Sequence, residues 1–128
     1  MKVLVIDDDA GMRFTIARIL RSGGYEVEMA DGGEHGLALF RKDRPDLVIC
    51  DLIMPHRSGI ETIVQIRCES PAMKIIAISG GDQVMNADGL ATALESGANE
   101  VIVKPFHAEE MLILVATLLG FQEPPEAR

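Results

Sequence analysis

The sequence predicts one α/β domain: a single, doubly wound sheet of five parallel strands with helices on both faces. Two observations predict this fold class. Short apolar stretches alternate with helical patterns along the whole chain, which is the order of a parallel sheet. Most of the apolar stretches are nearly continuous, which is typical of strands that are covered on both sides. With 128 residues, 48% of them hydrophobic, the chain is long enough to bury such a core.

Each expected strand is a short apolar stretch. In chain order, the expected strands cover residues 2–6, 25–29, 46–50, 74–79 and 100–104. The stretch YEVEM at 25–29 alternates apolar and acidic residues, so one of its faces meets water and it suits an edge of the sheet. Because crossovers between parallel strands are right-handed, the pattern favours the flavodoxin-like strand order 2-1-3-4-5.

The expected helices fill the intervals between strands and carry apolar residues at helical spacing. They cover residues 11–22, 33–42, 58–69, 88–96 and 107–119. Pro45 and Pro71 follow the second and third helices, and prolines commonly follow helix ends. Gly97 and Gly120 follow the last two helices, where glycine forms C-terminal caps.

Composition excludes several classes of partner. The net charge of −8 argues against direct nucleic-acid binding, because phosphate backbones are bound by clustered Lys and Arg. No apolar run approaches the roughly 20 residues of a membrane helix, and Met1 and Lys2 lead into the first strand without a signal peptide. Cys50 and Cys68 form no metal or redox pattern, and both are expected to be buried free thiols. We therefore expect a cytoplasmic protein that binds neither nucleic acid nor membranes.

Polar residues stand where four of the expected strands end. They are Asp7 and Asp8 after the first strand, Asp51 after the third, Ser79 at the end of the fourth and Lys104 at the end of the fifth. The carboxyl ends of parallel strands meet at one edge of the sheet, and ligands bind there beside the point where the strand order reverses. Because neighbouring carboxylates repel each other, this gathering of acids needs a cation.

The same residues resemble the motifs of the response-regulator receiver domain, the phosphorylatable module of two-component signalling. The resemblance depends on VIDDD, on DLIMPHRSG with its D-x-x-M-P-x-x-x-G spacing from Asp51 to Gly59, on Ser79, and on VKPF. It covers essentially all of residues 1–120, which are expected to form the receiver domain. Residues 121–128 are then a short tail, and no output domain is expected.

The resemblance implies a role for each residue of the site. Asp51 is the phosphoacceptor, Ser79 and Lys104 contact the phosphoryl group, and the metal ligands are Asp7, Asp8, Asp51 and the backbone carbonyl of Ile53. Pro105 is expected to follow a cis peptide bond that directs the lysine into the site.

The chemistry of these residue types supports the assignments. An ionised, aligned carboxylate such as Asp51 can attack phosphorus and form an acyl phosphate. Phosphoryl transfer depends on positioning and on positive charge at the equatorial oxygens. Because Mg²⁺ prefers carboxylate and phosphate oxygens, it is the expected cation, bound by Asp8 directly and by Asp7 directly or through water. Asp9 lies beyond the strand and is expected to begin the first helix, where its charge suits the helix dipole.

The resemblance also implies partners rather than a foreign substrate. The phosphoryl donor is expected to be a histidine kinase or a histidine phosphotransfer protein, and the output a contact with a downstream target protein. The chain is therefore expected not to be an enzyme, apart from catalysing its own phosphorylation and dephosphorylation. The last helix carries more apolar surface than one sheet face needs, with Ile113 outside the core-facing arc. A homodimer through the face of the fourth helix, fifth strand and last helix is a further expectation.

A second reading and two departures from the receiver pattern stay open. VLVIDDDAG also fits the D-x-D signature of haloacid-dehalogenase-like phosphatases, with Asp7 as nucleophile and Asp9 as acid/base, although this leaves Asp51 unexplained. Val101 stands where many receivers carry an aromatic residue that reports phosphorylation. The segment 80–89 contains three glycines and is expected to be either the moving part of the switch or a tolerant surface loop.

Overall fold

A computed structural model describes residues 1–54, 58–80 and 87–120 of the chain. It contains a parallel sheet of five strands in the order β2-β1-β3-β4-β5, which is the predicted order. The strands are β1 (Lys2–Ile6), β2 (Glu26–Ala30), β3 (Leu47–Asp51), β4 (Lys74–Ser79) and β5 (Glu100–Val103). Strands β2 and β3 begin one residue later than predicted, because pairing with β1 sets their register.

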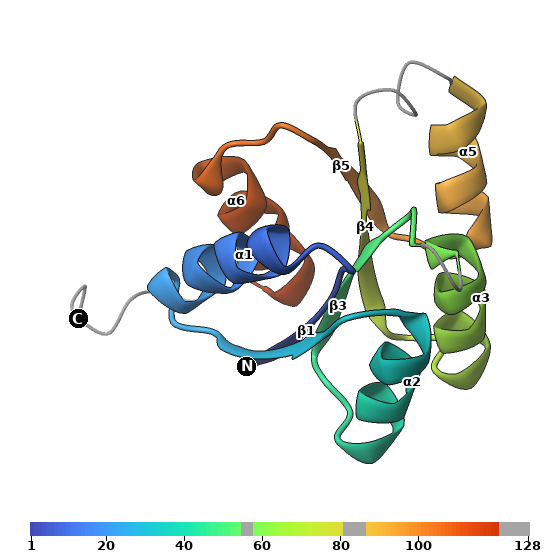
Figure 1. The fold of residues 1–128 in the computed structure, drawn as a ribbon, viewed down its shortest axis with the longest axis horizontal. Helices are drawn as coiled ribbons and strands as arrows, with labels where there is room; N and C mark the ends of the chain where they lie inside the picture. Colours follow the sequence, from blue (N-terminus) through green and yellow to red (C-terminus); the bar gives the residue numbers. More distant parts are fainter. Residues whose placement is uncertain (55–57, 81–86, 121–128) are drawn as a thin grey trace.

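Helices cover both faces of the sheet, as the sequence predicts (Figure 1). Helices α1 (Ala10–Ser22) and α6 (Ala108–Leu119) lie on one side, and α2 (Gly33–Lys42), α3 (Gly59–Glu69) and α5 (Ala87–Ser96) lie on the other. None of the helices in the described ranges is both long and apolar enough to cross a membrane.

The alternation of side chains along β1 divides the core into two layers. Val3 and Val5 pack in the cluster beneath α1 and α6, whereas Leu4 and Ile6 pack in the cluster beneath α2, α3 and α5. All five residues of β3 are buried, as expected for a central strand. Glu26 on β2 is exposed, which agrees with the edge position predicted from YEVEM.

Polar contacts tie together the amino ends of the strands. The side-chain oxygen Oδ1 of Asn99 accepts hydrogen bonds from the backbone N–H of Ile75 (2.8 Å) and from Nη2 of Arg67 (2.9 Å). The Arg67 guanidinium also donates to the carbonyl of Gly97. Near the start of β1, the Lys2 N–H donates to the Asp46 carboxylate at 2.8 Å.

The structure corrects one prediction about the cysteines. Cys50 is buried on β3, as predicted, but the prediction that Cys68 is buried was wrong, because its side chain is exposed. Helix α3 buries Ile63 and Ile66 against the sheet. Cys68 comes two residues after Ile66, about 200° around the helix, so it points to solvent. Residues 81–86 of the glycine-containing segment and the tail 121–128 lie outside the described residues.

Candidate functional site

Three carboxylates from two neighbouring strands meet at the carboxyl edge of the sheet. Asp51 is the last residue of β3, and Asp7 and Asp8 directly follow β1. One carboxylate oxygen from each of the three residues lies within 4.8 Å of the others. The structure therefore brings together the three acids that the sequence selected, and a single cation can contact all of them.

Asp7 is the most deeply buried of the three acids. Its Oδ1 accepts a hydrogen bond from the N–H of Asp9 at 2.9 Å, while its Oδ2 is buried and has no hydrogen-bond partner in the structure. Burial raises the pKa of Asp7, against the Asp9 N–H and Lys104, which both lower it. A buried carboxylate oxygen that accepts no hydrogen bond is costly, so this atom can bind a cation in addition to its ion pair with Lys104.

Asp51 is only 6% exposed. Burial, followed by the charge of Asp7, raises the pKa of Asp51 to about 6, although Lys104 and the N–H of Ile53 act in the opposite direction. The ionised form of Asp51 is therefore disfavoured in the folded protein, and a nearby cation would stabilise it. The Ile53 side chain itself is exposed.

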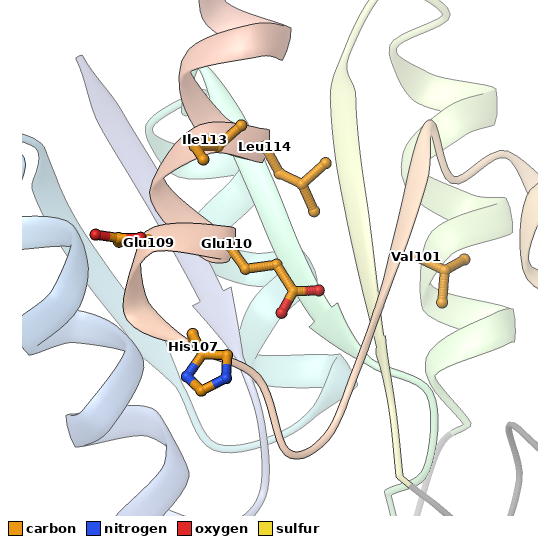
Figure 2. A pocket seen from close by; sticks show the side chains of 6 residues that line it. All are labelled: Val101, His107, Glu109, Glu110, Ile113 and Leu114. Atoms are coloured by element: carbon orange, nitrogen blue, oxygen red, sulfur yellow. The ribbon is translucent and has the colours of Figure 1, made fainter.

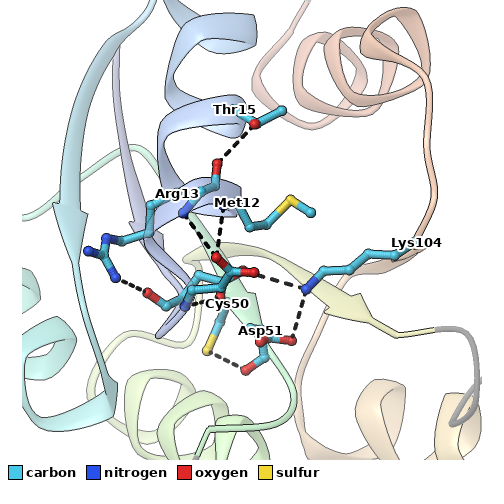
Figure 3. A network of polar contacts seen from close by, with 9 residues as sticks. Met12, Arg13, Thr15, Cys50, Asp51 and Lys104 are labelled. Carbon is cyan, nitrogen blue, oxygen red and sulfur yellow. Dashed lines mark hydrogen bonds and ion pairs between the residues drawn. The ribbon is translucent and has the colours of Figure 1, made fainter.

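Lys104 directly follows the edge strand β5, two strands away from β3, and its side chain contacts two of the acids. Its Nζ lies 3.7 Å from Asp7 Oδ2 and 3.9 Å from Asp51 Oδ1 (Figure 3). The peptide bond between Lys104 and Pro105 is cis, as the resemblance implied. Ser79 is buried at the end of β4, and its carbonyl accepts the backbone N–H of Lys104 at 2.9 Å.

The charges of the site do not balance within the described residues. Three carboxylates face one ammonium group, which leaves an excess of negative charge in a partly buried place. Mg²⁺ carries a double positive charge and prefers oxygen ligands. The residues present therefore fit this ion. Asp9 is not part of the cluster, because its Oδ1 caps α1 by accepting the N–H groups of Gly11 and Met12.

Gly59 explains the last position of the D-x-x-M-P-x-x-x-G motif. A Cβ atom at this residue would lie 1.9 Å from the backbone oxygen of Asp51 and 2.6 Å from Cα of Leu52. No side chain fits there without moving the backbone that carries Asp51. Glycine therefore allows the start of α3 to pack directly on the end of β3.

Sequence reasoning missed Arg13. Its guanidinium group reaches back from α1 and donates a hydrogen bond to the backbone carbonyl of Asp7 at 2.8 Å (Figure 3). The available signal was position: helical side chains point toward the N-terminus of their helix, and Arg13 lies one turn after the cap residue Asp9.

Val101 stands on β5 at the position where the receiver pattern often has an aromatic residue. It is partly buried and packs against the core cluster beneath α2, α3 and α5. The chain therefore has no aromatic ring at this position to report events in the site.

Comparison with known proteins gives one consistent result. A family model described as the response regulator receiver domain matches residues 3–116. The response regulator MprA of Mycobacterium leprae is 33% identical over 127 residues, which are 99% of this chain and 54% of that protein. MprA of Mycolicibacterium vanbaalenii is 34% identical over 126 residues, 98% of this chain and 53% of that protein. The chain thus spans about half the length of these curated relatives.

Solved structures agree with the sequence matches. The receiver domain of NtrX from Brucella abortus superposes with a TM-score of 0.87 at 26% identity, covering 94% of this chain and 99% of that one. A response regulator receiver domain protein from Clostridium thermocellum has a TM-score of 0.85 at 31% identity, covering 92% of this chain and 93% of that one.

Proposed function

The chain belongs to the response regulator receiver domain family, the phosphoacceptor module of two-component signalling, and from this premise we propose that Asp51 accepts the phosphoryl group. The alternative reading as a haloacid-dehalogenase-like phosphatase is not supported, because the matched family is a different one. The use of Asp9 as a helix cap, rather than as a free acid or base, agrees with that outcome.

One observation carries the proposal: three carboxylates and one lysine converge at the end of β3. The oxygens of Asp7, Asp8 and Asp51 lie close enough to share one cation, and Lys104 lies within 4 Å of both Asp7 and Asp51. We assign Asp7, Asp8, Asp51 and the backbone carbonyl of Ile53 as the ligands of Mg²⁺. The ion, when bound, neutralises charge on the phosphoryl oxygens.

The residues of the chain then act as follows. An ionised Asp51 carboxylate oxygen forms a bond to phosphorus, while the bond from phosphorus to the donor atom breaks and its electron pair leaves with the donor. Lys104 stabilises one equatorial oxygen through its charge, and the Ser79 hydroxyl donates a hydrogen bond to another. The product is an acyl phosphate on Asp51. The chemistry modifies the chain itself, which supports a signalling role rather than turnover of a foreign substrate.

The partners follow from this chemistry. The donor is a histidine kinase or a histidine phosphotransfer protein, and a downstream target protein binds the phosphorylated form. The receiver domain comprises residues 1–120 of the chain. A cytoplasmic location is part of the same proposal, and it is supported by the free thiol of Cys50, which suits a reducing compartment.

Intact-mass measurement tests the proposal. The protein is incubated with Mg²⁺ and acetyl phosphate, and the expected result is a mass gain of one phosphoryl group that is lost with a chelator. Asp51→Asn should abolish the gain. Asp9→Asn is the matched control, because asparagine also caps helices, and it should keep the gain. Labelling of the Asp51→Asn variant at the wild-type level would contradict the assignment.

A groove between β5 and α6 supports a second proposal, self-association. The groove has a volume of about 490 Å³ and is lined by Val101, His107, Glu109, Glu110, Ile113 and Leu114 (Figure 2). Ile113 is 64% exposed beside it, the largest exposed fraction among the large hydrophobic side chains in the described ranges. We propose that two copies pair through this face and that phosphorylation strengthens the pairing.

Sedimentation of the free and phosphorylated protein tests the pairing. Ile113→Glu should reduce association of the phosphorylated form, because it replaces the exposed apolar side chain beside the groove by a charged one. Phe14→Glu is the matched control, because Phe14 is 60% exposed on α1 and lines no part of the groove. A monomer in both states at tens of micromolar would exclude the dimer.

A further inference from the structure

The carbonyl group of Asp7 lies just beyond the sheet. The N–H of Asp7 donates to the carbonyl of Ala30 in β2, and the ladder between β1 and β2 ends at the pair Ile6 and Ala30, so the Asp7 carbonyl is the first one past the last pair on that side. Among the residues that the structure describes, its hydrogen-bond donor is Nη1 of Arg13, at 2.8 Å. Figure 3 shows the Arg13 side chain reaching back from α1, with its guanidinium on the side away from Asp51 and Lys104. A side chain of the first helix thus takes the place of the missing strand partner.

This hydrogen bond fixes the peptide unit that joins the two metal-binding acids. The carbonyl of Asp7 and the N–H of Asp8 belong to one planar group, so holding the oxygen holds the plane. The plane in turn sets the direction in which the Asp8 side chain leaves the backbone. The remaining bond of the turn, from the Asp9 N–H to Asp7 Oδ1 at 2.9 Å, holds the Asp7 carboxylate rather than the Asp7–Asp8 peptide.

Asp8 depends on this backbone more than the other two acids do. Its side chain is exposed, and within residues 1–54, 58–80 and 87–120 it has no hydrogen bond or ion pair. Asp7 is held by Asp9 and Lys104, and Asp51 is held by its burial and by Lys104. The position of the Asp8 carboxylate is therefore set mainly by the orientation of the peptide that Arg13 holds.

We propose that Arg13 is a positioning residue for the metal site. By holding the Asp7 carbonyl, it orients the peptide between Asp7 and Asp8 so that both carboxylates face one cation. The inference builds on the proposed Mg²⁺ site and adds a residue outside the ligand set. Residues that orient metal ligands typically change metal affinity 10- to 100-fold when they are replaced.

The sign of the effect separates positioning from simple electrostatics. Arg13 carries a positive charge close to the site, and a positive charge repels a divalent cation. If charge were its only contribution, removing the charge would tighten Mg²⁺ binding. If Arg13 orients the ligands, removing it weakens Mg²⁺ binding despite the more favourable charge.

Calorimetric titration of the unphosphorylated protein with Mg²⁺ tests the inference. Arg13→Gln should raise the dissociation constant about 10-fold, and Arg13→Lys should raise it less because lysine keeps a donor. Arg18→Gln is the matched control: it removes the same charge from an exposed position of the same helix and should leave the dissociation constant unchanged. Circular dichroism confirms that each variant is folded.

Phosphorylation kinetics give a second measurement. In Arg13→Gln, the Mg²⁺ concentration for half-maximal phosphorylation by acetyl phosphate should rise by the same factor, while the rate at saturating Mg²⁺ changes much less. An unchanged or lower dissociation constant in Arg13→Gln would overturn the inference and leave the proposed function intact. Wild-type protein that binds no Mg²⁺ would overturn both. If Arg13→Gln does not fold, Arg13→Lys is used instead. NMR then shows whether the hydrogen bond to the Asp7 carbonyl is lost in Arg13→Lys. Wild-type Mg²⁺ affinity in a variant that has lost this bond would overturn the inference.

Discussion

The polar side chains at the two ends of the parallel strands, here called the amino edge and the carboxyl edge of the sheet, differ in how they are paired. At the amino edge, charges and polar groups are paired: Asn99 binds Arg67 and the N–H of Ile75, and Asp46 accepts the N–H of Lys2. At the carboxyl edge, three carboxylates share one lysine, and Asp7 keeps a buried oxygen without a hydrogen bond.

The difference indicates that the amino edge contributes to the stability of the fold, whereas the carboxyl edge forms the functional site. Paired polar groups at the amino edge lower the energy of the folded chain. The buried carboxylates of Asp7 and Asp51 at the carboxyl edge raise it, because both would be better solvated in the unfolded chain. A cation can supply the missing interaction at the carboxyl edge, so binding of a cation there reduces the repulsion between the carboxylates. The two edges should therefore respond to mutation with opposite signs.

The largest effect is expected at the amino edge. Asn99→Ala removes the acceptor for the N–H of Ile75, a fully buried residue, and for one Arg67 bond. The free energy of unfolding should fall by about 2–3 kcal/mol, because a buried donor is left unsatisfied. Urea unfolding measures the change. Asn99→Asp keeps the acceptor and should lose much less, and phosphorylation at 25 °C should be unchanged in both variants. Loss of phosphorylation in folded Asn99→Ala would break the division between the edges.

A smaller effect of opposite sign is expected at the carboxyl edge. Burial raises the pKa of Asp51 from its ordinary 3.8 to about 6, so the folded state binds this proton more tightly than the unfolded state. Stability from the protonated carboxyl is present below about pH 4 and is lost as the pH rises through about 6. Asp51→Asn cannot ionise, so it should be more stable than wild type at pH 7.5 without Mg²⁺ by roughly 1–2 kcal/mol.

Urea unfolding at two pH values checks this prediction. The gain in Asp51→Asn should vanish near pH 4, where the wild-type carboxyl is also protonated, and addition of Mg²⁺ at pH 7.5 should stabilise the wild type more than the variant. A destabilised Asp51→Asn at pH 7.5 would show that the carboxylate edge is not under electrostatic strain, and the comparison between the edges would fail.

The smallest effect is expected from Lys104, whose single positive charge only partly neutralises the three carboxylates at the carboxyl edge. Lys104 lowers the pKa of both Asp7 and Asp51, so Lys104→Met should raise the pKa of Asp51, but only modestly because burial and the charge of Asp7 are the larger causes. Carboxyl ¹³C NMR without Mg²⁺ measures the titration. Lys2→Met is the control from the amino edge and should leave it unchanged. A lower pKa in Lys104→Met would contradict the ion-pair distances.

Much of the fold was predictable because its signals are local and periodic. The alternation of apolar stretches and helical patterns predicted where the strands and helices begin and end to within about one residue. The alternation of apolar and acidic residues in β2 indicated that it is an edge strand. Cys68 was misjudged because apolar neighbours in sequence do not lie on the same face of a helix. Its exposure depends on which side of α3 meets the sheet.

The sequence by itself determined which side chains gather at the carboxyl edge of the sheet. Strand ends and the rule for crossovers are enough to bring Asp7, Asp51 and Lys104 to one edge. Only the tertiary structure decided how these groups interact: the burial that raises the pKa of Asp51, the close packing that excludes a side chain at Gly59, and the reach of Arg13 to the Asp7 carbonyl. The physical reason is that periodicity specifies direction along one element, whereas burial and distances of a few ångströms depend on how separate elements pack.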